Sequence, residues 1–246
     1  MNTQARIALW QIPTSSLAEQ AQLPAKIKTL QQQLSHIAER FERVTLANSL
    51  AVEDMVLTDV IAKLELPIDV FVLNTGKLHA ETVSYLSSVK AQYPNISISV
   101  FKPQAAALSS FAQDYEFADI YQSLAARKAC CHARKSEPLQ RALQHYQAWL
   151  TGQRREQSIT RSALAAEEFD SGHDLVKFNP LADWSQQDVW AYIQQQQIPI
   201  NPLYQRGMPS IGCEPCTKAI RQGEEIRAVR WWWESQDSKE CGLHTG

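Results

Sequence analysis

Long apolar runs are absent from this sequence. No segment approaches the roughly 20 consecutive apolar residues that a membrane-spanning helix requires, and residues 1–24 lack the basic-then-apolar pattern of a secretory signal. These absences predict a cytoplasmic protein without a membrane partner. With 44% apolar and 20% charged residues, the composition is that of an ordinary globular protein.

A large excess of charge is absent as well. The formal net charge is −2, which argues against a nucleic-acid partner. The basic residues nevertheless gather in groups, and several cationic side chains together suit a small polyanion. Taken alone, each group could also be the solvated face of a helix. The groups are Arg127, Lys128, Arg134 and Lys135; Arg154, Arg155 and Arg161; and Arg221, Arg227 and Arg230.

Cysteine is scarce, with five residues, and a disulfide framework would leave one of them over. Four of the five form two pairs, the adjacent Cys130-Cys131 and the Cys213-x-x-Cys216 turn. Four thiolates suit a zinc ion or an iron–sulfur cluster. The adjacent pair favours the cluster, because neighbouring side chains diverge and a cubane offers them two separate iron corners. Structural zinc, disulfides and unligated thiols remain alternatives.

The fifth cysteine, Cys241, stands near the C-terminus in Lys-Glu-Cys-Gly-Leu-His. With the other four cysteines used, it is expected to be a free thiol. Gly242 would give the segment flexibility and His244 is a candidate cationic neighbour, so Cys241 could act as a nucleophile. An unused surface cysteine is the alternative, because a lone cysteine near a histidine is a weak signal.

Strand and helix patterns alternate along the chain, which predicts right-handed crossovers and a parallel sheet in an α/β fold. Short apolar runs predict strands over residues 44–47, 68–73, 96–101 and 148–152. Apolar residues spaced by three and four predict helices over residues 26–43 and 81–92. Residues 104–150 are expected to be mainly helical before the last of these strands, with a break near Cys130.

Domain boundaries follow from the same patterns. Pro13 and Pro24 interrupt the helical signal, so residues 1–25 are predicted to be a variable leader. Residues 26–233 are predicted to form a single α/β domain with candidate nucleotide-binding loops, and residues 234–246, which carry Cys241, a C-terminal tail that would be catalytic if Cys241 is the nucleophile.

Three loops are candidate ligand sites. Residues 48–54 follow a strand and open a helix, and a helix N-terminus offers free N–H groups to a phosphate. This loop has no glycine. Residues 74–79 follow the next strand, and ligands of parallel sheets lie at such strand ends. Residues 153–161, with Arg-Arg-Glu-Gln-Ser and Arg161, offer guanidinium groups and a hydroxyl to an anion.

The two cysteine pairs, together with Glu-Cys-Gly-Leu-His at the C-terminus, resemble the assimilatory adenylyl-sulfate reductases, the iron–sulfur branch of the PAPS/APS reductase family. The resemblance runs from about residue 40 to the end. It implies a doubly wound parallel sheet of the adenine-nucleotide-binding, PP-loop ATPase-like type, with a mobile C-terminal tail. It also implies a 4Fe-4S cluster on Cys130, Cys131, Cys213 and Cys216. Ala51 stands where the family usually has glycine.

The resemblance further implies the reaction. Cys241 would attack the sulfur atom of adenosine 5'-phosphosulfate, AMP would leave, and thioredoxin would release sulfite from the S-sulfocysteine. Residues expected to bind the substrate are Ser49, Glu53, Thr75, Gly76, Lys77, Lys135, Arg154, Arg155, Arg161, Arg227, Arg230 and His244. A homo-oligomer is left open.

Three alternatives have distinct signatures. The chain could reduce 3'-phosphoadenylyl sulfate instead. A sulfur transferase acting on tRNA should carry a glycine-rich ATP loop and a basic RNA-binding face, and this chain has neither. A zinc-stapled nucleotide-binding module without catalysis would not need Cys241.

Overall fold

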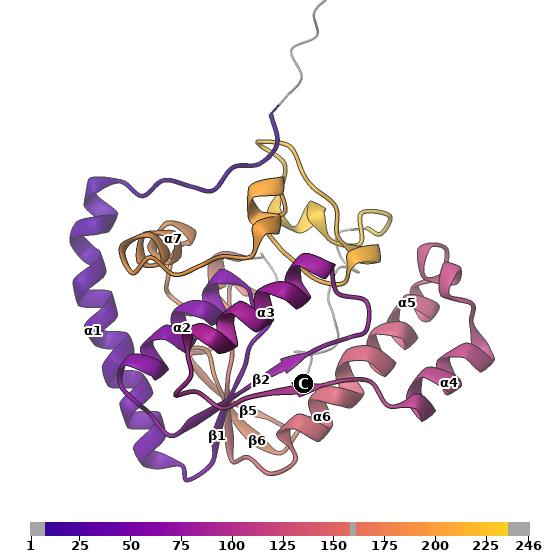
Figure 1. Ribbon diagram of the computed structural model, residues 1–246, viewed down its shortest axis with the longest axis horizontal. Coiled ribbons are helices and arrows are strands. Elements are labelled where there is room, and N and C mark those ends of the chain that lie inside the picture. Colours follow the sequence, from indigo (N-terminus) through magenta and orange to yellow (C-terminus); the bar gives the residue numbers. More distant parts are fainter. Residues whose placement is uncertain (1–7, 158–160, 236–246) are drawn as a thin grey trace, which may run out of the picture.

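The computed structural model of the chain describes residues 8–157 and 161–235, which form a six-stranded sheet and the helices around it (Figure 1). The strands are β1 (Val44–Ala47), β2 (Ile68–Leu73), β3 (Ile98–Phe101), β4 (Ala148–Leu150), β5 (Glu167–Asp170) and β6 (Leu175–Phe178). The α-helices are α1 (Leu17–Arg40), α2 (Val52–Lys63), α3 (Ala80–Gln92), α4 (Ala105–Asp114), α5 (Leu124–Cys131), α6 (Glu137–Leu143) and α7 (Gln186–Gln195). Short 3-10 turns cover Phe117–Tyr121, Arg155–Gln157, Pro202–Arg206, Glu214–Cys216 and Ile226–Val229, and a π-helical turn covers His132–Ser136.

The strands lie in the order β3-β2-β1-β4-β6-β5. Neighbouring strands are parallel except β5 and β6, which pair antiparallel. From β1 the chain moves outward through β2 to β3 and then returns to the other side of β1 as β4. The strand order therefore reverses between β1 and β4. Ligands of open α/β sheets bind at such a point, beyond the carboxyl ends of the strands.

Helices cover both faces of the sheet, which confirms the predicted doubly wound fold. In Figure 1, α1, α2, α3 and α7 lie together on one side, and their buried residues share the main core with β1 and β2. On the other face Leu139 and Leu143 of α6 pack against Phe71 and Trp149. No helix in the described ranges is both long enough and apolar enough to cross a membrane.

The first helix begins earlier than predicted. α1 starts at Leu17, where the Ser16 side chain accepts from the Glu19 N–H and the Glu19 side chain accepts from the Ser16 N–H. Pro24 lies inside this helix, so the expectation that it interrupts the helix is wrong. The buried stripe that includes Leu23 and Leu30 packs α1 into the main core on both sides of the proline. Part of the predicted leader is therefore helical.

The hairpin of β5 and β6 was not predicted from the sequence. β5 reads Glu-Glu-Phe-Asp, and its one large apolar side chain, Phe169, is 65% exposed. This strand lies at the edge of the sheet and has no apolar face, so its sequence lacks the pattern by which strands are recognised. The predicted strand over residues 96–101 is also shorter in the structure, because pairing with β2 begins at Ile98.

Candidate active site

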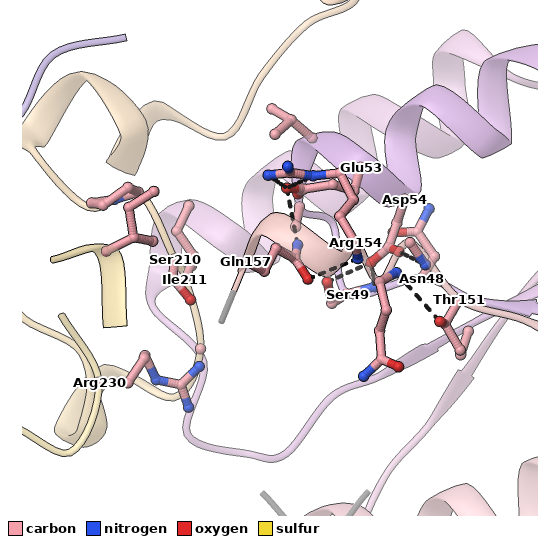
Figure 2. Close-up of a pocket in the computed structure, with 18 of the residues that line it drawn as sticks. Asn48, Ser49, Glu53, Asp54, Thr151, Arg154, Gln157, Ser210, Ile211 and Arg230 are labelled. Atoms are coloured by element: carbon pink, nitrogen blue, oxygen red, sulfur yellow. Dashed lines mark hydrogen bonds and ion pairs between the residues drawn. The ribbon is translucent and has the colours of Figure 1, made fainter. Parts of the chain in front are cut away.

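A cavity of about 400 Å³ opens beyond the carboxyl ends of β1 and β4, at the reversal of strand order. The loop from β1 to α2 forms one wall, residues 151–154 form a second, and residues 209–213 form a third. We call this space the active-site cavity. Figure 2 shows Glu53, Asp54 and Arg154 together on one side of it, with Arg230 apart from them on the other.

Asp54, in the first turn of α2, holds the β1–α2 loop. Its Oδ2 accepts hydrogen bonds from the Ser49 N–H (2.7 Å) and hydroxyl (2.5 Å), and its Oδ1 accepts one from the Gly152 N–H (3.0 Å). Burial raises the pKa of this carboxyl from 3.8 to about 6, although the bonds from Ser49 oppose the rise. A Cβ at position 152 would lie 2.8 Å from the Glu53 Cβ and would overlap Asp54, so this close approach requires glycine. Asp54 thus joins the loops that follow β1 and β4.

The backbone explains how the β1–α2 loop forms without glycine. Ala51 is the N-cap residue of α2 and has φ −76°, which any residue adopts. The left-handed residue is Leu50, with φ 65°, and its side chain is buried. Its N–H donates to the Asn48 Oδ1 at 2.6 Å, which closes a local turn. Position 51 therefore does not itself demand glycine.

The Arg154 side chain donates hydrogen bonds to several groups of the protein itself. Its Nε and Nη2 donate to the Glu53 Oε1 (3.2 and 3.0 Å), and its Nη1 donates to the Glu156 Oε2 (3.0 Å) and the Trp184 carbonyl (3.2 Å). Gln157 Nε2 donates to the same Glu53 oxygen at 3.1 Å. The charge of Arg154 is therefore balanced by carboxylates within the wall. We call this side, with Glu53, Asp54 and Glu156 around Arg154, the acidic end of the cavity.

Arg230 lies across the cavity from the acidic end (Figure 2), and Lys135 joins it beside the cysteines; Arg227 is a further cationic lining residue, and we call these three the cationic end. Arg230 Nε donates to the Cys216 carbonyl (3.3 Å), and its guanidinium carbon lies 4.6 Å from the centre of the Trp231 ring. Within the described part of the chain, the buried Nη2 of Arg230 has no hydrogen-bond partner. Leaving a buried guanidinium nitrogen without an acceptor is costly, so this end favours an anionic ligand.

The four cysteines of the two predicted pairs meet beside the cationic end. Cys130 and Cys131 end α5, immediately before the π-helical turn, while Cys213 and Cys216 flank the 3-10 turn at Glu214–Cys216. All four line one small cavity of about 20 Å³, and none is in a disulfide. We call these residues the cysteine centre. Its cavity and the active-site cavity share Lys135, Cys213, Arg230 and Trp231 as lining residues.

The thiols of the cysteine centre are close enough to affect one another. Burial raises the pKa of Cys130, and burial together with Cys213 raises the pKa of Cys216 to about 11. Lys135 acts in the opposite direction on both thiols. In the described ranges, no three or more His, Cys, Asp or Glu side chains are arranged around a position that could hold a single metal ion. A preformed zinc site is thus not observed there.

The donor chemistry of the cysteine centre nevertheless fits an iron–sulfur cluster. The fold brings together four thiols, the donors that such clusters use, from segments more than 80 residues apart. Lys77, Arg134, Lys135 and Arg230 line the same cavity and would offset the negative charge of thiolates. The Thr75 hydroxyl also lies 3.2 Å from the Cys213 sulfur. These cationic neighbours, around a centre that lies in an apolar cluster with Ile120 and Trp231, suit an anionic group.

The structure brings most of the predicted substrate-binding residues to the active-site cavity. These are Ser49, Glu53, Thr75, Lys135, Arg154, Arg161, Arg227 and Arg230. Gly76 and Lys77 are not among its lining residues; their loop packs on the cysteine turn, where the Lys77 carbonyl accepts from the Glu214 N–H at 2.8 Å. Arg155 also points elsewhere, to the Asp183 carboxylate and the Leu164 carbonyl. Cys241 and His244 lie outside the described residues.

Several residues that organise the site were not among the individual residues predicted to bind the substrate, although Asp54 lies in the predicted 48–54 loop. Asp54, Gly152 and Gln157 organise the acidic end, and Gly212 lies against the guanidinium of Arg230. Arg134 donates to the Thr75 carbonyl at 2.9 Å and thereby ties the loop after β2 to the cysteine centre. The two glycines were the readable signal, because each stands within two residues of a predicted site residue, Arg154 or Cys213, and is needed where backbone and side chain approach closely.

Together, the fold and the site define an α/β protein with a cavity at the reversal of its strand order, whose cationic end adjoins a four-cysteine centre. Residues 43–219 match the family described as the phosphoadenosine phosphosulfate reductase domain. The chain therefore belongs to the phosphoadenosine phosphosulfate reductase family.

Relatives and solved structures agree with this membership. The chain is 52% identical to an adenosine 5'-phosphosulfate reductase of Burkholderia cepacia over 91% of this chain and 89% of that protein. It is 50% identical to the reductase of the same name from Neisseria meningitidis serogroup A, over 96% and 97%. A crystal structure of the phosphoadenylyl-sulfate reductase of Candida auris has a TM-score of 0.67 at 24% identity, covering 85% of this chain and all of that one. Yeast FAD synthetase shares the fold, which is of the PP-loop ATPase-like type. The TM-score is 0.58 at 15% identity, and the match covers 85% of this chain and 70% of that one.

Proposed function

We propose that this protein reduces adenosine 5'-phosphosulfate to sulfite and AMP in sulfate assimilation, acting in the cytoplasm. The proposal rests on one observation at the cationic end of the active-site cavity. There the buried Nη2 of Arg230 lacks an acceptor among the described residues, next to Lys135 and directly beside the cysteine centre. A phosphosulfate group would supply that acceptor. The names of the relatives at 52% and 50% identity support the same substrate.

The different charges at the two ends of the cavity support one orientation of the substrate. The phosphosulfate lies at the cationic end, where Lys135, Arg227 and Arg230 donate charge-assisted hydrogen bonds to its oxygens. The nucleoside, which is uncharged, extends toward the β1–α2 loop and the walls formed by Phe71 and Trp149. Binding several oxygens of one anion also fixes the direction in which a nucleophile must approach its sulfur.

Cys241 is the proposed nucleophile. Its thiolate forms a bond to the sulfuryl sulfur while the bond from that sulfur to the bridging oxygen breaks, and AMP leaves with the electron pair. One thiolate of reduced thioredoxin then attacks the Cys241 sulfur, and sulfite leaves with the electron pair. The second thiol of thioredoxin completes a disulfide and frees Cys241. Two electrons thereby pass from the dithiol to the sulfur that becomes sulfite.

We further propose that Cys130, Cys131, Cys213 and Cys216 hold a 4Fe-4S cluster. When bound, the cluster would supply a charged and polarisable centre next to the phosphosulfate site. Lys135, which lines both cavities, lies between the two and can donate to the substrate anion while it offsets thiolate charge. Arg134 holds the Thr75 carbonyl, and with it the loop that carries Lys77, in place beside the cysteines.

Anaerobically purified protein tests both proposals. It should contain iron and acid-labile sulfide at about four each per chain. With reduced thioredoxin it should release sulfite from adenosine 5'-phosphosulfate faster than from the 3'-phosphorylated compound. Cys241→Ser should keep the iron and lose sulfite release, since a hydroxyl is scarcely ionised at neutral pH. Stoichiometric zinc without sulfide would refute the cluster, and sulfite release by Cys241→Ser would refute the nucleophile.

A further inference from the structure

A buried ion pair joins α5 to the last residues of the chain that the structure describes. Arg127 lies on α5, and its partner Glu234 follows 107 residues later. The Arg127 Nε donates to one oxygen of the Glu234 carboxylate and the Nη2 donates to the other, each at 2.8 Å. The two side chains are 1% and 7% exposed. A planar contact through two parallel hydrogen bonds permits a narrow range of orientations, so it fixes the direction of both partners.

The backbone before Glu234 is held as well. Trp231 is buried and has φ 41°, and a bulky residue in the left-handed region persists only where its surroundings hold it. The Trp231 N–H donates to the Cys216 carbonyl at 3.3 Å, and the Trp231 carbonyl accepts from the Glu234 N–H at 2.9 Å. The guanidinium carbon of Arg127 lies 4.8 Å from the centre of the Trp231 ring. Arg127 therefore contacts both ends of residues 231–234, which we call the tail root.

The tail root lies between the two cavities and the proposed nucleophile. Trp231 lines both the active-site cavity and the cavity of the cysteine centre. Arg127 precedes Cys131 by about one turn of the same helix. Cys241 follows Glu234 by seven residues, which can span at most about 25 Å. The position and direction of Glu234 therefore limit where the Cys241 thiol can reach.

We propose that Arg127 is a positioning residue, which holds Glu234 and thereby directs the segment that carries Cys241 toward the cationic end of the active-site cavity. The proposal rests on the proposed function for the role of Cys241. Stability alone does not call for this pair, because buried charges lose their hydration and apolar side chains of similar volume often stabilise a fold as well. Apolar side chains do not provide the fixed orientation of a bidentate contact. Because α5 ends in Cys130-Cys131, one helix positions both the cysteine centre and the tail root.

Glu234→Gln tests the proposal, because it keeps the size of the side chain and removes its charge. The holoenzyme is mixed with adenosine 5'-phosphosulfate without reductant, and the sulfonate adduct on the Cys241 peptide is followed by rapid quenching and mass spectrometry. The rate of adduct formation should fall on the order of tenfold. Iron content and AMP affinity should match those of the wild type, because neither Arg127 nor Glu234 lines the two cavities. Arg127→Lys keeps the charge without the fork of two donors and should lose less.

A second measurement follows the tail root without any reaction. A fluorophore is attached to Cys241 of the holoenzyme, and peptide mapping confirms its position. Release of the tail root should let the label turn more freely, so its fluorescence anisotropy should be lower in Glu234→Gln than in the wild type. Glu167→Gln is the matched control, because Glu167 also pairs with a distant arginine, Arg40, at 2.8 Å, but both side chains are exposed and neither lines the active-site cavity. The control should change neither the rate nor the anisotropy.

The outcomes separate this proposal from the proposed function. If folded Glu234→Gln forms the adduct at the wild-type rate or keeps the wild-type anisotropy, the positioning role is refuted. A loss of AMP affinity equal to the loss of rate also refutes it, because that result indicates a general disturbance of the site. If the wild type forms no adduct on Cys241, the proposed function is refuted, while a lower anisotropy in Glu234→Gln still upholds the anchoring of the tail root by Arg127. If Glu234→Gln does not fold, Arg127→Lys decides by the same two measurements.

Discussion

Replacing Gly212 by alanine should displace Arg230 and weaken substrate binding while the fold remains intact. A Cβ at this position would lie 2.5 Å from the Nη2 of Arg230 and closer still to its Nη1 and Cζ. Van der Waals contact needs about 3.4 Å or more between such atoms, so the guanidinium must move by roughly 1 Å. That movement would also disturb its hydrogen bond to the Cys216 carbonyl and its packing on Trp231.

The size of the effect follows from the role of Arg230 in the cavity. A hydrogen bond to a charged group contributes about 1.5–3 kcal/mol, and each 1.4 kcal/mol is about a factor of ten in affinity. The dissociation constant of adenosine 5'-phosphosulfate should therefore rise by roughly 10- to 100-fold. AMP should lose less, because it lacks the sulfate oxygens that the cationic end is expected to bind.

Equilibrium binding in a Cys241→Ser background measures this change without turnover. Iron and sulfide contents must match the parent protein, because Gly212 directly precedes Cys213. Gly172→Ala is the control, since a Cβ there would meet only the Asp170 Oδ1, at 3.4 Å. Arg230→Gln removes the charge without crowding position 212 and should weaken binding to a similar extent. Unchanged affinity in both Gly212→Ala and Arg230→Gln would refute the assignment of the cationic end.

Other predictions test the acidic end, a buried ion pair and the nucleophile. Because burial raises the pKa of Asp54 from 3.8 to about 6, the folded protein favours the neutral form of this carboxyl. The resulting stabilisation of the fold is fully present below about pH 4 and is lost as the pH rises to 6, by about 3 kcal/mol. The denaturation midpoint of Asp54→Asn should lack that decline, and parallel pH curves for variant and wild type would contradict it. Arg127→Leu should lower the free energy of unfolding by about 3–5 kcal/mol, because it leaves the buried carboxylate of Glu234 without its partner. Arg127 Nε and Nη2 each lie 2.8 Å from an oxygen of Glu234, and both side chains are buried. A loss below about 1 kcal/mol in denaturant unfolding would count against this. Wild type mixed with substrate but no reductant should carry a sulfonate-sized adduct on the Cys241 peptide, detected by mass spectrometry and removed by reduced thioredoxin; an adduct on another cysteine would reassign the nucleophile.

Local sequence was sufficient for the central part of the fold. β1, β2 and the start of α3 were predicted to within one residue, because buried strands and amphipathic helices carry their periodicity in consecutive residues. The β5–β6 hairpin was missed because an exposed edge strand has no such pattern. α1 was predicted too short because Pro24 was weighed above the Ser16 and Glu19 capping pattern, which was present in the sequence.

The sequence also predicted which residues form the cysteine centre, because cysteine is scarce in this chain and four of its five cysteines stand in two closely spaced pairs. Spacing alone paired Cys130 with Cys131 and Cys213 with Cys216, and the structure brings the two pairs to one cavity. The reason is chemical: four thiols outside disulfides have few structural uses, so their spacing is informative.

What only the tertiary structure decided is the direction of individual side chains. Arg154 and Arg155 are adjacent and look alike in the sequence, yet Arg154 turns to Glu53 in the cavity and Arg155 turns to Asp183 outside it. Asp54 was expected to border a phosphate site, but its carboxylate accepts hydrogen bonds from the donors of that site, among them the N–H of Gly152, 98 residues away. A local pattern shows which chemical groups a segment carries. Which groups meet depends on contacts between distant segments, because packing and burial select the rotamer of each side chain and the partner that satisfies its charge.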